Sequence, residues 1–293
     1  MASVVGVHGI GQQYRTQPEL ERVWTDALEG GLRLSGQSRR IPGIRVAAFG
    51  DLFRQRQSLG SALEWPPYTA ADLKDSDERA LLEVLFQAAS QMQPDVAIAP
   101  GALSPRTPVT VQRMVAGLLR SGLLAGMTER VLVGNLKQVV SYQKDSNVRD
   151  QIRARLEEAV DEETRVLIGH SLGSVITYEY LAAGLAPQVQ LHLTCGSPLG
   201  IPRVIFDRLT PEPSRGIGNW AGSVRRWVNL ADSGDFVAMV KSISPLFESG
   251  PDGRAIEDFR VMNGGKAHSC RRYLNSVETG SAIGSVLDEA MNA

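Results

Sequence analysis

The sequence predicts an α/β protein in which helices flank a mostly parallel, minimal sheet of about six strands. Strand-like and helix-like segments alternate along the chain, which is typical of a sheet joined by helical crossovers. Most strand-like segments are continuous apolar runs, as expected where helices cover both faces of a parallel sheet. Hydrophobic residues make up 43% of the 293 residues, which is enough for a sizeable core.

Turn residues and apolar periodicity delimit the expected elements. The strands end at short turns such as Gly50-Asp51, and the helices carry apolar residues at helical spacing, as Leu20, Trp24 and Leu28 do. We expect strands at residues 2–7, 44–49, 164–168, 189–194, 226–230 and 258–262. We expect the helices that flank the sheet at residues 18–34, 147–160, 171–183 and 284–291.

One long interval interrupts this alternation. More than a hundred residues separate Asp51 from Arg165, where a single crossover helix would suffice. The interval shows three additional helical patterns, at residues 78–92, 109–127 and 129–142. We interpret the chain as a single domain, residues 1–293, with a helical cap or lid inserted at residues 54–143.

Composition and charge exclude several classes of protein. Lys and Arg number 31 against 32 Asp and Glu, a balance that argues against a dedicated nucleic-acid binder. The two cysteines, Cys195 and Cys270, form neither a disulfide framework nor a multi-thiolate zinc site. We expect no secretory signal, because the first residues lack the basic flank and the length of one. Arg120 interrupts the most apolar long stretch, residues 114–127. We therefore expect a cytoplasmic protein with no transmembrane segment, metal or cofactor; its oligomeric state is not predicted.

The strongest local signal is Gly169-His170-Ser171-Leu172-Gly173, a Gly-x-Ser-x-Gly motif. A strand is expected before it and a helix after it, which is the context that a nucleophile elbow needs. The sharp turn would expose the hydroxyl of Ser171 above the amino terminus of the helix. The alternative is an ordinary turn between strand and helix, with Ser171 as the helix cap.

The segment His8-Gly9-Ile10-Gly11 follows the first expected strand. Acyl-transfer enzymes stabilise a tetrahedral oxyanion with backbone N–H groups, which a glycine-rich loop can turn inward. The candidate donors are Leu172, directly after the serine, and Ile10 or Gly9. A simple tight turn is the alternative, and the spacing of the glycines does not match a dinucleotide-binding loop.

A serine nucleophile needs a base, and the chain has four histidines. His8 and His170 belong to the two motifs and are best interpreted as scaffold. His192 lies in the middle of an expected strand, where a buried structural role is favoured. His268 lies in a loop after the last expected strand, which suits a general base, and a solvated surface histidine is its alternative.

The acid that orients this base is expected between the serine and the histidine. Asp232 lies close to the end of a strand, and Asp235 follows on a turn before an apolar segment that is expected to be helical. From the residues alone both remain candidates, and the one without this role would be a turn or capping residue.

With these residues in the order Ser, Asp, His, the chain resembles the α/β-hydrolases of the serine esterase and lipase type. The resemblance is carried by four segments: Gly169–Gly173 for the elbow, Val7–Gly11 for the oxyanion segment, Ser233–Val237 for the acid, and Gly196-Ser197-Pro198-Leu199 after the next strand. The resemblance implies a nucleophilic Ser171, a basic His268 and an orienting Asp235, with Asp232 as the alternative acid. The candidate substrate-binding residues beside them are His8, Gly11, His170 and Leu199.

Two departures from the family refine this expectation. The oxyanion strand is the first strand of the chain, so we expect the two antiparallel strands that usually open the fold to be absent. Without these strands, the chain would be most similar to compact lipases and to serine esterases resembling the GPI inositol-deacylases. The inserted cap has no counterpart in the family and is expected to carry specificity.

The implied activity is hydrolysis of a carboxylic ester, with a medium-chain acyl group favoured. A thioesterase, lactonase, amidase or acyltransferase would use the same residues, and a catalytically silent binding protein would share the fold. Aliphatic residues of the cap, among them Leu82, Met114, Leu118 and Val133, would form either an apolar groove for the acyl chain or the internal core of the cap. Lipid binding through the cap is a further alternative.

Overall fold

The computed structural model describes residues 3–37, 43–54, 68–93, 108–124 and 127–292, without the side chains of Ser3 and residues 289–292. Parts of the expected cap, residues 55–67, 94–107 and 125–126, lie outside the described residues. The chain divides into two compact units, and each is described by itself. The first comprises Met1–Phe49 and Asp150–Ala293, and the second comprises Gly50–Arg149.

The first unit is built on a sheet of six strands in the order β2-β1-β3-β4-β5-β6, and all neighbouring pairs are parallel. The strands are β1 (Ser3–Val7), β2 (Ile44–Ala47), β3 (Thr164–His170), β4 (Leu191–Cys195), β5 (Arg226–Asp232) and β6 (Glu257–Val261). The expected α/β class and number of strands are confirmed. The central strands β3 and β4 are almost wholly buried, which explains their apolar sequences.

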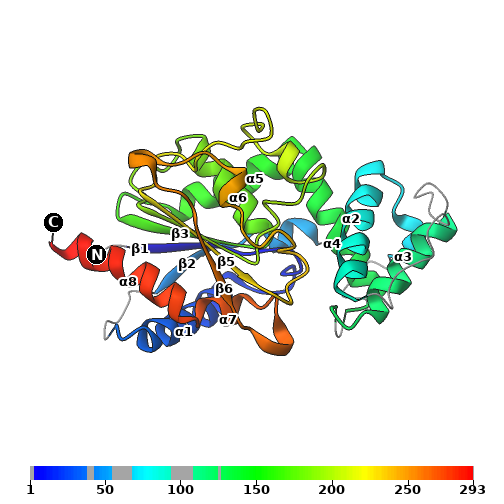
Figure 1. Ribbon diagram of the computed structural model, residues 1–293, viewed down its shortest axis with the longest axis horizontal. Helices are drawn as coiled ribbons and strands as arrows, with labels where there is room; N and C mark the ends of the chain where they lie inside the picture. Colours follow the sequence, from blue (N-terminus) through cyan, green and yellow to red (C-terminus); the bar gives the residue numbers. More distant parts are fainter. Residues whose placement is uncertain (1–2, 38–42, 55–67, 94–107, 125–126, 293) are drawn as a thin grey trace. The chain divides into compact units, whose positions relative to one another are not determined.

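Helices cover both faces of this sheet: α1, α7 and α8 lie on one face, and α5 and α6 lie on the other (Figure 1). Their bounds are α1 (Gln17–Leu34), α5 (Ser146–Ala159), α6 (Leu172–Ala182), α7 (Cys270–Leu274) and α8 (Val277–Asn292). Thr16 caps α1 by accepting a hydrogen bond from the N–H of Glu19. A core cluster packs α1 and α8 against the sheet through residues such as Trp24, Leu28, Ile168 and Ile283.

Three expectations for the elements of this unit were wrong. Helix α7 was not expected, and α8 begins at Val277 rather than at residue 284. Glycine lowers helix propensity, but at Gly280 it permits close packing, because a Cβ there would lie 2.1 Å from the carbonyl oxygen of Gly31 in α1. The segment after Asp235 is a series of turns rather than a helix. Asp235 accepts hydrogen bonds from the N–H groups of Val237 and Ala238, and this side-chain bonding competes with a helix.

Within its described residues, the second unit has three α-helices that pack on one another, α2 (Ser76–Met92), α3 (Pro108–Arg120) and α4 (Glu129–Lys144). Helix α3 ends at Arg120 rather than at residue 127, and the left-handed Gly122 follows it. The side chains of Leu82, Leu118 and Val133 are fully buried. These aliphatic residues therefore form packed interior rather than an open apolar surface. Within the described residues no helix, α3 included, is long and apolar enough to cross a membrane.

Short 3-10 helices occur in both units. They are η1 (Gly50–Phe53), η2 (Ala70–Asp72), η4 (Phe206–Arg208), η5 (Ser244–Leu246), η6 (Pro251–Gly253) and η7 (Gly264–Lys266). The last of these opens the loop that carries His268.

Candidate active site

The two glycine-containing motifs follow neighbouring strands at the point where the strand order reverses. The chain adds β2 on one side of β1, whereas β3 pairs with the other side and leads on toward β6. Helices α1 and α6, which follow β1 and β3, accordingly lie on opposite faces of the sheet (Figure 1). Ligands of open parallel sheets bind at such switch points, at the carboxyl ends of the strands.

Ser171 occupies a strained backbone conformation between β3 and α6, with φ 54° and ψ −129°. Non-glycine residues rarely adopt positive φ, and such strain is often found at functional sites. Its side chain does not cap α6, although the sequence allowed that alternative. The flanking glycines are sterically required: a Cβ at Gly173 would lie 2.1 Å from the carbonyl oxygen of Val7, and one at Gly169 would lie 2.4 Å from the Cα of Ser174. This is the backbone geometry that the expected nucleophile elbow requires.

Two buried serines, Ser174 and Ser197, stabilise the turn at Ser171. Ser174 Oγ donates to the carbonyl oxygen of Ser171 at 2.6 Å and lies 2.7 Å from Ser197 Oγ. Because Ser174 already donates its only hydroxyl proton to Ser171, Ser197 is the donor in the hydrogen bond between the two hydroxyl groups. Ser197 Oγ in turn accepts from the N–H of Leu199 at 3.2 Å. The Gly-Ser-Pro segment after β4 therefore supports the elbow. The side chain of Leu199 is fully buried, so it has no exposed surface for the expected contact with substrate.

The segment after β1 lies directly against Ser171. A Cβ at Gly9 would be 2.6 Å from Ser171 Cβ and 3.1 Å from Ser171 Oγ, so glycine is needed for this approach. His8 fixes the next peptide group. Its Nε2 accepts from the N–H of Phe49 at 3.0 Å, and its Nδ1 therefore carries the proton donated to the carbonyl oxygen of Gly9 at 2.6 Å.

This bond determines the direction of one candidate oxyanion donor. In a planar trans peptide the N–H of Ile10 points away from the carbonyl oxygen of Gly9, and hence away from the ring of His8. Leu172, as the first residue of α6, has an N–H without an intrahelical acceptor. His8 itself is buried and stacked on Phe49 at 4.1 Å between ring centroids, so it is scaffold rather than a group that contacts substrate. Gly11 lies next in this loop with φ 81°, which glycine adopts readily.

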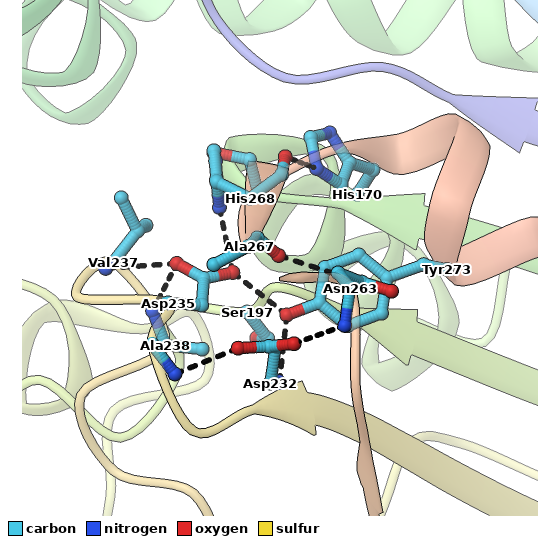
Figure 2. Close-up of polar contacts among 12 residues, drawn as sticks. His170, Ser197, Asp232, Asp235, Val237, Ala238, Asn263, Ala267, His268 and Tyr273 are labelled. Carbon is cyan, nitrogen blue, oxygen red and sulfur yellow. Dashed lines mark hydrogen bonds and ion pairs between the residues drawn. The ribbon is translucent and has the colours of Figure 1, made fainter. Parts of the chain in front are cut away.

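His268 and Asp235 form a hydrogen-bonded pair at the same edge of the sheet. His268 Nδ1 lies 2.8 Å from Asp235 Oδ2 (Figure 2). The carboxylate is completely buried, whereas 32% of the His268 side chain is exposed. Burial alone would raise the pKa of Asp235, but the neighbouring His268 and the hydrogen bonds from His268, Tyr273 and Ala238 outweigh burial and hold this pKa well below its usual range. Asp235 is therefore an ionised acceptor that orients an accessible imidazole.

Asp232, the alternative acid, has different partners. Its Oδ1 accepts from the N–H of Gly234 at 2.7 Å, and its Oδ2 accepts from the N–H of Asn263. The bond from Asn263 joins the loop after β5 that carries both aspartates, here called the acid loop, to the loop that carries His268. Asp232 thus serves as a turn residue, which is a common role for aspartate, while the structure pairs His268 with Asp235.

His170 supports the loop of His268 from β3. Its Nε2 lies 3.1 Å from the carbonyl oxygen of His268, and because a carbonyl only accepts, the ring must donate. Burial, followed by the neighbouring His268, lowers the pKa of His170 to about 3, so the ring is neutral at ordinary pH. Asn263 adds a second anchor, since its Nδ2 donates to the carbonyl oxygen of Ala267 at 2.9 Å. His170 is therefore placed as scaffold, the interpretation favoured by the sequence.

Ser171 and His268 lie at the same edge of the sheet without a direct hydrogen bond. The N–H of Ser171 donates to the carbonyl oxygen of Cys195 at 3.1 Å, and the next residue, Gly196, adjoins the Asp235–His268 pair. Among the described residues, however, Ser171 Oγ has no hydrogen bond to His268. Such bonds are often long in structures without substrate and tighten when it binds.

Three site residues were not anticipated from the sequence. Tyr273 donates to Asp235, Lys241 Nζ donates to the carbonyl oxygens of Asp232 and Asp235, and Ser174 supports the elbow. Ser174 lies three residues after Ser171, one helical turn away, and this spacing was an available signal. Lys241 and Tyr273 have no such local signal. The fourth histidine, His192, is fully buried and lies 2.9 Å from Thr177 Oγ1, as expected for a structural residue.

Comparison of the chain with protein-family models, with curated proteins and with solved structures found no significant match. Within the described ranges no three His, Cys, Asp or Glu side chains are grouped so that they could hold a metal ion.

Proposed function

We propose that this protein is a serine hydrolase with an α/β-hydrolase fold that cleaves carboxylic esters through an acyl-enzyme on Ser171. The observation that carries the proposal is the combination of a strained serine at a strand–helix turn with a buried Asp–His pair at the same sheet edge. A six-stranded parallel sheet with its switch point at the serine is compatible with this fold. The free thiols of Cys195 and Cys270 suit a reducing compartment, so we propose that it acts in the cytoplasm.

The proposed mechanism uses His268 as base and then as acid. His268 Nε2 takes the proton of Ser171 Oγ as this oxygen attacks the acyl carbonyl, and Asp235 stabilises the imidazolium through Nδ1. The N–H groups of Leu172 and Ile10 donate to the tetrahedral oxyanion. His268 then gives its proton to the leaving alkoxide oxygen. Water, deprotonated by His268, attacks the acyl-enzyme, and the proton returns to Ser171 as the carboxylic acid leaves.

Labelling of the full chain with a fluorophosphonate probe tests this proposal. An activated serine should be phosphonylated, and peptide mapping should locate the adduct on Ser171, whereas heat-denatured protein should remain unlabelled. A series of p-nitrophenyl esters measures the acyl chain that the site prefers, for which we propose medium length. If the folded protein is neither labelled nor active on any ester in the series, the proposed function is wrong.

Gly196 provides a steric test of the Asp–His pair. A Cβ at this position would lie 2.9 Å from Asp235 Oδ2 and 3.1 Å from His268 Nδ1. We expect Gly196→Ala to lower kcat/KM on the best ester about 100-fold, because displacement of catalytic groups by about 1 Å has effects of this size. The matched control is Gly184→Ala, where φ is also positive but no atom lies within 4 Å of the new Cβ. Both variants should be less stable, and equal activities would show that the contact at Gly196 does not matter.

A further inference from the structure

Tyr273 places its hydroxyl group between the two aspartates of the acid loop. It lies on α7 (Cys270–Leu274), the short helix that follows the His268 loop, and its side chain is fully buried. The hydroxyl is 2.9 Å from the backbone nitrogen of Asp232 and 2.8 Å from Asp235 Oδ2 (Figure 2). Helix α7, which follows the loop of His268, therefore contacts Asp235 directly through Tyr273.

The direction of both hydrogen bonds follows from the chemistry of the groups. The N–H of Asp232 can only donate, so the tyrosine oxygen accepts there and its own proton is directed to Asp235. Burial, followed by the negative charge of Asp235, raises the pKa of Tyr273 well above its usual value. Tyr273 is therefore a protonated donor at ordinary pH.

Tyr273 and His268 share one carboxylate oxygen. Both His268 Nδ1 and the Tyr273 hydroxyl lie 2.8 Å from Asp235 Oδ2, while Oδ1 accepts from the N–H groups of Val237 and Ala238. Rotation of the carboxyl group would break all four contacts at once. The hydroxyl consequently fixes Asp235 in the orientation that faces His268, and it withdraws negative charge from the oxygen that binds the imidazole.

We propose that Tyr273 is the positioning residue of the Asp235–His268 pair and that its hydroxyl determines where the acid limb of the pH–activity profile lies. This proposal depends on the function proposed above. Sharing Oδ2 weakens the pull of the carboxylate on the His268 Nδ1 proton, so the acid limb of activity should lie at lower pH than it would without the Tyr273 hydroxyl. In an esterase this widens the pH range of activity toward acid.

Other titratable groups surround the pair, but they act differently. His170 faces His268 with ring centroids 4.8 Å apart, and its low pKa keeps it neutral. Lys241 donates to backbone carbonyl oxygens of the acid loop, and the carboxylate of Asp232 is occupied by backbone N–H groups. The thiol of Cys270 contacts that of Cys195, and burial raises its pKa well above the usual value. Among the described residues, only Tyr273 and His268 donate a side-chain proton to the carboxylate of Asp235.

The test compares Tyr273→Phe with Tyr178→Phe in the full chain. Tyr178 is also fully buried and donates one hydroxyl hydrogen bond, to the carbonyl oxygen of Asn219 at 3.1 Å, so both variants lose a buried hydroxyl. For Tyr273→Phe we expect kcat on the best p-nitrophenyl ester to fall about tenfold with KM unchanged. We expect the acid limb of its kcat/KM profile to move about 0.5 units to higher pH, because the carboxylate then holds the imidazolium more strongly. Tyr178→Phe should keep the wild-type pH profile.

A second readout does not require turnover. The proton between His268 Nδ1 and Asp235 Oδ2 should give a far-downfield NMR resonance, and Tyr273→Phe should move it further downfield, because the carboxylate becomes the stronger acceptor. An unchanged resonance and pH profile in Tyr273→Phe would overturn the proposal. So would equal losses of activity in both variants at an unchanged pH profile, since that indicates a structural role only. If the wild type has no esterase activity, the proposed function fails, and the resonance still decides whether Tyr273 tunes the pair.

Discussion

Replacement of Ser171 by alanine is expected to lower kcat on the best p-nitrophenyl ester by about 10⁶-fold, the loss typical when the nucleophile of a serine hydrolase is removed. The oxyanion donors and the Asp–His pair would remain, but no oxygen would be available to form the acyl-enzyme. Stability should change little, because the side chain of Ser171 makes no cap bond and alanine meets the same positive φ as serine. Turnover measured beside a thermal unfolding curve separates the two effects.

The control for this experiment is Ser223→Ala. Ser223 is an exposed serine whose Oγ donates only to the carbonyl oxygen of Pro187. It should retain full activity and full labelling by a fluorophosphonate. If Ser171→Ala retained appreciable turnover, an acyl-enzyme on Ser171 would be excluded, and the strained turn would need another explanation.

The parts of the site that could be predicted from sequence are those in which neighbouring residues perform one task. Gly169, Ser171 and Gly173 form a motif because the turn itself requires small residues on both sides, and the structure shows the contacts that impose this requirement. The alternating strands likewise predict the order of helices around the sheet. His268 could be selected because only four histidines exist and the other three lie within expected strands or motifs.

The remainder depends on contacts between residues that are far apart in the sequence. Tyr273 is 38 positions from Asp235, and a tyrosine in a short helix gives no local indication that its hydroxyl will reach a carboxylate. The choice between Asp232 and Asp235 was open from the residues alone, because both follow the same strand. The expected helix after Asp235 was wrong for a related reason: the apolar pattern was present, but the carboxylate of Asp235 binds the N–H groups that a helix would use.

The two aspartates can be distinguished by one pair of amide substitutions. Asp235→Asn is expected to lower kcat by about 10⁴-fold, as expected when the acid of a Ser–His–Asp triad becomes an amide. An amide has no charge to stabilise the imidazolium, and its NH₂ group can donate to His268 Nδ1. That interaction favours the ring tautomer with its proton on Nε2, where it can no longer accept the proton of Ser171.

Asp232→Asn, by contrast, should lower kcat by no more than about tenfold. The asparagine can still accept from a backbone N–H, and the group that it replaces does not contact His268. Its main effect should be on the free energy of unfolding, because the bond from the N–H of Asn263 loses its charged acceptor. Steady-state kinetics and urea unfolding of both variants provide the comparison.

If Asp232→Asn were the more damaging to kcat, Asp232 would be the orienting acid and the His268 loop would have to rearrange during turnover. Equal and small losses in both variants would mean that His268 acts without a carboxylate partner.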